Sequence, residues 1–168
     1  MTIQYAMVID TKTCIGCGDC VVACKTENKT PVGLNRDWVV EATRGKWPNL
    51  TTEFRSERCN HCSNATCVTM CPTGASHYWG DTNIVLVEAH KCTGCKACIA
   101  ACPYDARLIM HPEGYIDKCT FCHHRVEKGQ DPACVSSCPT ECMHFGILND
   151  PGSKVSQLLK TRNYKALM

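Results

Sequence analysis

Apolar and polar residues alternate along this chain only in short segments. Four segments rich in β-branched or alternating apolar residues predict strands, at residues 4–10, 37–43, 84–88 and 106–110. Residues 21–29 and 99–102 predict short helices. Near the end of the chain, Ser153 is placed to cap a helix that continues through residues 155–160. Short elements of both kinds predict an α+β fold.

Aliphatic residues are scarce once cysteine is set aside. The chain has 168 residues, of which 44% count as hydrophobic, but 17 residues are cysteine. Leu, Ile, Val and Phe together make up less than a fifth of the chain. A domain so poor in aliphatic side chains cannot easily offset the entropy of ordering its backbone. Something other than an ordinary apolar core is therefore expected to hold it together.

Charge, hydropathy and motifs exclude several classes of protein. A formal charge of +2 and a pI near 7.8 indicate neither a basic nucleic-acid surface nor an acidic tail. No apolar run approaches the roughly 18 residues of a membrane span. The N-terminal residues show no secretory or twin-arginine signal, so none is expected. No G-x-G-x-x-G or G-x4-G-K-[ST] motif is present, so no nucleotide site is expected.

Sixteen of the cysteines fall into four groups of four. The first and third groups share the spacing C-x2-C-x2-C-x3-C and the similar sequences KTCIGCGDCVVACK and HKCTGCKACIAACP. The second is C-x2-C-x4-C-x3-C and the fourth is C-x2-C-x11-C-x3-C, and both end in the tripeptide CPT. In order, the groups are Cys14, Cys17, Cys20 and Cys24; Cys59, Cys62, Cys67 and Cys71; Cys92, Cys95, Cys98 and Cys102; and Cys119, Cys122, Cys134 and Cys138, with Cys142 left over. The chain therefore contains an internal repeat.

This spacing suits [4Fe–4S] clusters. A tight loop with a cysteine at every third position reaches three of the four irons, and the fourth thiolate must come from elsewhere. In the ferredoxin run C-x2-C-x2-C-x3-C-P the fourth cysteine ligates the other cluster of a pair. Gly16, Gly18 and Gly94 allow the backbone to wrap closely and to direct N–H groups toward sulfur. With sixteen ligands committed, no iron remains for a substrate, which predicts electron transfer rather than catalysis.

Other uses of the cysteines fit the spacing less well. Disulfides are disfavoured because no export signal is visible and because C-x2-C-x2-C packs thiols too densely for unstrained bridges. Structural zinc needs two separated pairs, and the triplets overfill such a site. Residues 119–123, CTFCH, match the c-type haem attachment motif. Haem there would leave Cys134 and Cys138 without a role, so we interpret the match as chance.

Several residues near the groups have two readings. His61 and His90 could donate hydrogen bonds to cluster sulfur and raise its potential, or be partly exposed loop residues. Cys142 is expected to be a free or buried thiol. Five lysines could soften the negative charge of the clusters or form a solvated face. These are Lys12, Lys25, Lys91, Lys96 and Lys118.

Residues 32–57 contain no cysteine. We expect this segment to be an insertion that packs outside the cluster-binding core. Trp38 and Trp47 lie within it and are expected to be packing residues rather than electron relays.

The four groups, in this order, resemble the four-cluster iron–sulfur (beta) subunit of the molybdopterin (dimethyl sulfoxide reductase) family. CPYDARLI at 102–109, GYIDKCTFCHHRVEKGQDPACVSSCPT at 114–140 and FGIL at 145–148 are especially similar to the polysulfide and thiosulfate reductase branch. The resemblance covers roughly residues 3–160. Some members carry a C-terminal transmembrane helix, whereas this sequence ends at Met168. Membrane attachment is therefore expected to come through a partner.

The resemblance implies four [4Fe–4S] clusters with crossed ligands. Some relatives replace a cysteine of the third group and carry a [3Fe–4S] centre, but this chain keeps Cys92, Cys95 and Cys98. The implied sets are Cys14, Cys17, Cys20 and Cys138 for cluster 1; Cys24, Cys119, Cys122 and Cys134 for cluster 2; Cys59, Cys62, Cys67 and Cys102 for cluster 3; and Cys71, Cys92, Cys95 and Cys98 for cluster 4.

The same resemblance implies two interlocked bacterial-ferredoxin-like (βαβ-type) halves. Residues 1–31 and 113–150 would form the first half and residues 58–112 the second. Residues 32–57 would be the insertion and residues 151–168 a C-terminal helix and tail.

The function implied is that of a non-catalytic electron-transfer subunit of a sulfur-compound respiratory reductase. It would link a molybdenum or tungsten bis-pterin catalytic subunit to a quinone-reactive integral membrane subunit, with electrons passing groups one, four, two and three in turn. A soluble polyferredoxin and a structural zinc module are the alternatives. The complex is expected on the extracytoplasmic face of the membrane by co-export with a partner, although the cytoplasmic face also fits.

Overall fold

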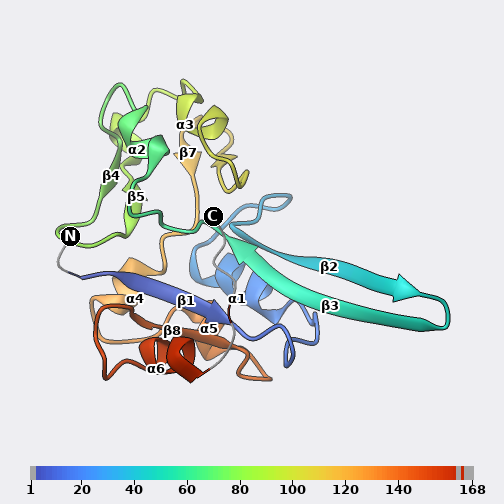
Figure 1. The fold of residues 1–168 in the computed structure, drawn as a ribbon. Coiled ribbons are helices and arrows are strands. Elements are labelled where there is room, and N and C mark those ends of the chain that lie inside the picture. The colour runs from blue at the N-terminus through green and yellow to red at the C-terminus, as the bar shows by residue number, and fades with distance from the viewer. Residues whose placement is uncertain (1–2, 162–163, 165–168) are drawn as a thin grey trace.

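The computed structural model describes residues 3–161 and residue 164 (Figure 1). The expected C-terminal tail lies partly outside these residues. The strands are β1 (Tyr5–Ile9), β2 (Asp37–Lys46), β3 (Asn49–Arg58), β4 (Ser76–Tyr78), β5 (Val85–Val87), β6 (Leu108–Ile109), β7 (Ile116–Asp117) and β8 (Met143–Ile147). The helices are α1 (Asp19–Glu27), α2 (Thr66–Thr69), the 3-10 turn η1 (Ala89–Lys91), α3 (Ala97–Ala100), α4 (His123–Val126), α5 (Ala133–Ser136) and α6 (Lys154–Thr161).

The first and last strands bring the two ends of the chain together. β1 pairs antiparallel with β8, with Ala6 opposite Gly146, and α1 packs against α5. Figure 1 shows these blue and orange-red elements side by side, with α6 next to β8. The pairing places the first cysteine group next to the fourth.

The middle of the chain folds on itself in the same way. β4 pairs antiparallel with β5, β6 pairs antiparallel with β7, and α2 packs against α3. The Thr66 hydroxyl of α2 donates a hydrogen bond to the Ala101 carbonyl just after α3, at 2.9 Å. These elements, coloured from green to light orange, lie together in the upper part of Figure 1. They bring the second cysteine group next to the third.

A long hairpin leaves the body of the molecule. β2 and β3 pair along their whole length, from Asp37 opposite Arg58 to Lys46 opposite Asn49 (Figure 1). Its outer part is exposed, and Trp47 at the tip is 85% exposed, so the expectation that Trp47 packs is wrong. Asp37, Ser56 and Arg58 at its base are buried. The expectation that residues 32–57 lie outside the core is therefore wrong at the base of the hairpin, where the two strands reach the cysteines.

Several predicted elements are confirmed within a few residues. The strands expected at 4–10, 37–43 and 84–88 correspond to β1, β2 and β5, and the one at 106–110 shrinks to β6. The helices expected at 21–29 and 99–102 begin two residues earlier, as α1 and α3. The C-terminal helix α6 begins directly after Ser153.

The core is built largely from thiols. Seven cysteines are buried in the described part of the chain, whereas only four valine and isoleucine side chains are. Cys20, Cys134 and Cys142 pack with Met143 in one cluster, and Cys119 packs with Ile84 and Phe121 in another. The scarcity of aliphatic residues in the sequence thus corresponds to a core in which sulfur takes their place.

Candidate iron–sulfur cluster sites

Each cysteine group begins with a loop of the same backbone shape. In every group the residue before the second cysteine has a positive φ: 70° at Gly16, 46° at His61, 66° at Gly94 and 51° at Phe121. A left-handed residue at this point lets successive backbone N–H groups face one concave side, where they can receive an anion. The repeat detected in the sequence is therefore also a repeat of loop conformation.

Glycine is required at two of these positions by close contacts. A Cβ atom on Gly94 would lie 2.6 Å from the carbonyl oxygen of Gly114, and one on Gly16 would lie 2.5 Å from Cδ1 of Phe54. The backbone of the first and third loops is therefore covered at short range by another part of the chain. This agrees with the close wrapping predicted for Gly16 and Gly94.

Backbone N–H groups point at several of the sulfurs. The N–H of Phe121 donates to Sγ of Cys119 at 3.4 Å, and that of Ile116 donates to Sγ of Cys92 at 3.5 Å. The N–H of Ser76 donates to Sγ of Cys71 at 3.4 Å. Such bonds stabilise a thiolate relative to a thiol. The donor set is therefore suited to a group that binds thiolates.

The first group shares a pocket with a cysteine from the far end of the chain. The pocket is lined by five cysteines together with Ser56 and Thr140. The five cysteines are Cys14, Cys17, Cys20, Cys138 and Cys142. The first three cysteines of group one thus meet the last cysteine of group four.

The fourth cysteine of the first group lies with the fourth group. Nδ2 of Asn28 is 3.6 Å from Sγ of Cys24 and 3.9 Å from Sγ of Cys122. Burial, followed by the negative charges of Asp37 and Cys122, raises the pKa of Cys24 to about 12. Burial also raises the pKa of Cys134 to about 12, with Cys122 and Cys24 adding to the effect. The structure therefore brings Cys24 together with Cys122 and Cys134.

The second group meets the last cysteine of the third. Burial raises the pKa of Cys62, and the neighbouring charges of Cys59, Cys67 and Cys102 raise it further. Cys102 thus lies close enough to the second group for its charge to raise the pKa of Cys62.

The third group has contacts of a different kind. Burial raises the pKa of Cys98, the buried guanidinium of Arg107 lowers it, and Cys67 and Cys92 raise it. Arg107 is held in place by a 2.8 Å hydrogen bond from Nη2 to the Ser76 hydroxyl. Sγ of Cys71 contacts its own loop, at Thr73 Oγ1 (3.7 Å) and the Ser76 N–H. The crossing of Cys71 to the third group therefore stays a prediction.

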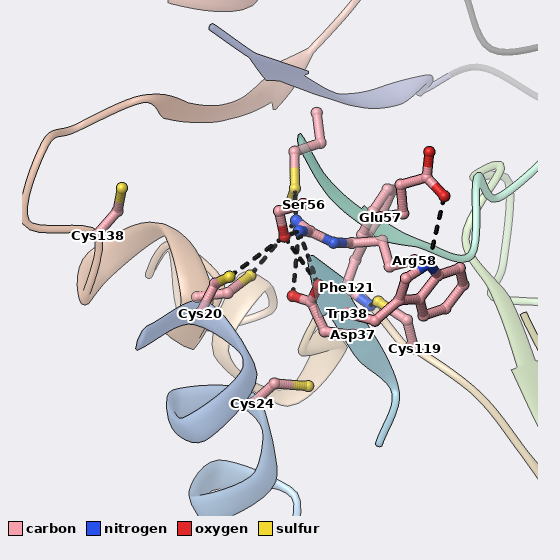
Figure 2. Close-up of polar contacts among 12 residues, drawn as sticks. Cys20, Cys24, Asp37, Trp38, Ser56, Glu57, Arg58, Cys119, Phe121 and Cys138 are labelled. Carbon is pink, nitrogen blue, oxygen red and sulfur yellow. Dashed lines mark hydrogen bonds and ion pairs between the residues drawn. The ribbon is translucent and has the colours of Figure 1, made fainter. Parts of the chain in front are cut away.

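A buried ion pair at the base of the hairpin lies between the first and fourth groups. Nη2 of Arg58 is 3.1 Å from both carboxylate oxygens of Asp37, and the two side chains are only 5% and 1% exposed. The Ser56 hydroxyl donates to Asp37 at 2.8 Å and lies 3.2 Å from Sγ of Cys20. Nη1 of Arg58 is 3.8 Å from Sγ of Cys134 and also contacts Sδ of Met7. Figure 2 shows these contacts converging beside α1.

Arg58 is held as a cation by its surroundings. Burial alone would lower its pKa, but the negative charges of Asp37, Cys134 and Cys119 raise it above its usual value. Arg58 belongs to no motif that marks it in the sequence. Its position directly before Cys59 is the one available signal, but that position does not reveal that the side chain faces other groups.

His61 was interpreted either as a hydrogen-bond donor to cluster sulfur or as a partly exposed loop residue, and the second interpretation is wrong. It is 1% exposed, and its ring stacks on Phe121 with 3.8 Å between ring centroids. Nδ1 accepts a 3.0 Å hydrogen bond from the Val85 N–H, so the neutral ring carries its proton on Nε2. Burial, followed by the charge of Lys118, lowers the pKa of His61 well below its usual value. His61 is therefore a buried, neutral ring that carries its proton on Nε2.

His90 is exposed to solvent, whereas Lys118 is buried. The His90 side chain in η1 is 77% exposed and its Nε2 lies 3.3 Å from Oε2 of Glu88, so His90 is exposed as expected but is not in a loop. Lys118 is 1% exposed, and its Nζ donates to the carbonyls of Cys119 (2.7 Å) and Val85. The solvated reading is therefore wrong for Lys118.

The alternatives for the cysteines can be compared with this geometry. All seventeen cysteines are unpaired. Among the described residues, no three His, Cys, Asp or Glu side chains lie close enough together to hold one metal ion. Cys119 and Cys122, the two cysteines of the haem-like motif, lie with Cys24 and Cys134. The cysteines of the haem-like motif therefore lie with a thiol of the first group and one of the fourth.

Comparison with known proteins identifies the family. Two family models, each described as a 4Fe-4S dicluster domain, match the chain over residues 13–75 and 50–148. Protein NrfC of Escherichia coli is 43% identical over 162 residues, which cover 95% of this chain and 73% of the relative. The chain belongs to the iron–sulfur (beta) subunits of the dimethyl sulfoxide reductase family.

Two further relatives are named for reductases of sulfur compounds. The thiosulfate reductase electron transfer subunit PhsB of Salmonella typhi is 46% identical over 153 residues, covering 89% of this chain and 79% of the relative. A tetrathionate reductase subunit of Salmonella typhimurium is 43% identical over 158 residues, covering 93% of this chain and 63% of the relative. Members of this family serve as electron-transfer subunits of reductase complexes, and so does this chain. Within its described residues, no helix is long and apolar enough to span a membrane.

Proposed function

We propose that the chain binds four [4Fe–4S] clusters through sixteen cysteines in the crossed sets implied by its family. The observation that carries the proposal is the grouping of thiols from distant parts of the sequence. Cys138 lines the pocket of the first group, Cys24 lies with Cys122 and Cys134, and Cys102 lies with the second group. The assignment of Cys71 to Cys92, Cys95 and Cys98 follows from the symmetry of the repeat.

The crossed sets give a molecule of two interlocked ferredoxin-like halves. The pairing of β1 with β8 supports a half made from residues 1–31 and 113–150. The contact of α2 with α3 supports a half made from residues 58–112. The base of the β2–β3 hairpin belongs with the first half, since it contacts Cys20 and Cys134.

Contacts between the sets suggest an order for electron transfer. Arg58 lies near Cys134 of set 2 and, through Ser56, near Cys20 of set 1. Cys119 of set 2 is close enough to Cys59 of set 3 for the charge of one to raise the pKa of the other. Cys67 of set 3 acts on Cys98 of set 4 in the same way. These neighbours support the order 1–2–3–4, along which each bound cluster would supply a one-electron carrier.

The family resemblance implies the two ends of this line. We place a molybdenum or tungsten bis-pterin catalytic subunit of a sulfur-compound reductase at set 1, and a quinone-reactive integral membrane subunit at set 4. The complex would sit on the extracytoplasmic face by co-export with a partner, with the cytoplasmic face as the alternative. Stable co-purification with a large pterin-containing chain distinguishes this role from that of a soluble polyferredoxin.

Metal analysis of the anaerobic protein tests the cluster content. We expect roughly 16 iron and 16 acid-labile sulfide per chain, four of each per cluster. About four zinc ions per chain without sulfide would contradict the proposal.

A single substitution tests the crossing. Cys24→Ser removes a cysteine of the first group but, in the crossed arrangement, a ligand of set 2. Electron paramagnetic resonance should therefore show a changed signal from the cluster of Cys119, Cys122 and Cys134. Cys17→Ser is the matched control, because it should change the cluster of the first group instead. If both variants alter the same signal, the crossing is wrong.

A further inference from the structure

Cys142 occupies a position that differs between the two copies of a repeat. Residues 71–75 read CPTGA and residues 138–142 read CPTEC. In both copies the threonine Oγ1 lies 3.7 Å from Sγ of the leading cysteine, and the fourth residue has a positive φ. In both, the fifth residue is buried, with Ala75 1% exposed and Cys142 3% exposed. The backbones correspond, and the thiol of Cys142 is the difference between the two fifth residues.

This extra thiol faces the proposed set 1. Sγ of Cys142 is 3.4 Å from Sγ of Cys138, and both residues line the pocket of Cys14, Cys17 and Cys20. The carbonyl of Cys142 is fixed by a 2.8 Å hydrogen bond from the Asp10 N–H, so its backbone is anchored. Five thiols therefore surround a site that requires four.

We propose that Cys142 is an alternative fourth ligand for cluster 1, able to take the place of Cys138. The inference rests on the proposed function, because it requires a cluster in this pocket. The sulfur atoms are already neighbours, and a change of one χ1 rotamer moves a cysteine sulfur by about 3 Å without moving the backbone. In the exchange, the Cys142 thiol loses its proton and binds iron. The Cys138 thiolate leaves the iron and takes up one proton, so no oxidant or reductant is required.

Cysteine variants of the full chain, loaded anaerobically, test the exchange. Cys138→Ala should keep the wild-type content of about 16 iron, with a shifted signal from cluster 1 in electron paramagnetic resonance. Cys142→Ala should also keep that content, because Cys138 remains. The double variant Cys138→Ala/Cys142→Ala should lose between about one and four irons, as cluster 1 becomes three-iron or is lost.

The other copy of the repeat supplies a matched control. Cys71→Ala has only Ala75 at the corresponding position, so it should lose iron as the double variant does. Adding the thiol in Cys71→Ala/Ala75→Cys should restore the lost iron. This second variant keeps the test informative even if Cys138→Ala folds poorly.

The outcomes separate the two proposals. A wild-type chain without iron and sulfide would contradict the proposed function. Suppose instead that the wild-type chain holds four clusters and that Cys138→Ala loses as much iron as Cys138→Ala/Cys142→Ala. That result would overturn the role of Cys142 and leave the proposed function standing. Failure of Ala75→Cys to restore iron in the Cys71→Ala background would count against the role of Cys142 in the same way.

Discussion

Arg58 and Asp37 form an ion pair inside the protein, whereas Arg44 and Glu53 form one on the same hairpin in solvent. The side chains of the first pair are 5% and 1% exposed, and those of the second are 73% and 38% exposed. Removing one partner of a buried pair leaves an uncompensated charge, which costs about 3–5 kcal/mol. An exposed pair contributes about 0–1 kcal/mol.

We therefore expect Arg58→Met to destabilise the holoprotein by about 3–5 kcal/mol and Arg44→Met by less than about 1 kcal/mol. The midpoint of urea-induced loss of cluster absorbance, measured anaerobically, reports the difference. Asp37→Asn combined with Arg58→Met should recover part of the loss, since neither charge is then left unpaired. Equal effects of the two single arginine variants would contradict a structural role for the buried pair.

The proposed ligand residues follow from the sequence, but their surroundings do not. Cysteine spacing predicts which residues bind iron, because a cluster fixes the distances between its ligands. Arg58, Asp37 and Ser56 carry no such pattern, and they meet Cys20 and Cys134 only because the hairpin folds back onto α1. The burial of Lys118 and His61 could not be predicted either, since polar residues beside a cysteine are ordinarily exposed.

At the scale of elements, long segments were easier to predict than single turns. β1, β2 and α1 have enough residues to show a pattern. α2, α4 and α5 have four residues each, about one helical turn, and therefore no periodicity. β3 was missed although it has ten residues. Its outer part is exposed on both faces, so it lacks the apolar alternation that marks a half-buried strand.

The hairpin divides into an outer part and a base with different roles. Thr43 and Thr52 face each other midway, with their hydroxyl oxygens 3.3 Å apart. Replacing residues 44–51 by an Asn-Gly turn should leave iron and sulfide contents unchanged, because the outer part is exposed and the base is kept. Phe54→Ala is the contrasting variant, since Phe54 lies against Gly16 in the first loop. We expect Phe54→Ala to speed the oxygen-induced bleaching of cluster absorbance. Loss of iron from the variant with the shortened hairpin would contradict the division into an outer part and a base.

At the scale of the whole molecule, the thiol core leads us to expect that folding depends on the clusters. Free thiols in this core contribute little stability by themselves, because each small side chain buries little apolar surface. Removing iron anaerobically with a chelator and a reductant should therefore unfold the chain, as happens in other domains nucleated by metal. Circular dichroism and amide hydrogen exchange measure the loss. A metal-free chain that keeps native protection of β1 and β8 would show that the fold does not need the clusters.

Cluster binding also changes the charge of the molecule. The sequence has a formal charge of +2 and a pI near 7.8. An oxidised [4Fe–4S] core with four thiolates carries about −2, so four of them would bring the total to about −6. The loaded protein should therefore focus at a pI well below 7.8 and bind an anion exchanger at neutral pH.

The metal-free chain is the control for this change in charge, because its thiols are neutral near pH 7. Anaerobic isoelectric focusing of both forms gives the measurement, and the number of clusters sets the size of the shift. Binding of four zinc ions by sixteen thiolates would also make the chain acidic. The focusing experiment is therefore combined with sulfide analysis, and a loaded chain that still focuses near 7.8 would contradict both kinds of thiolate site.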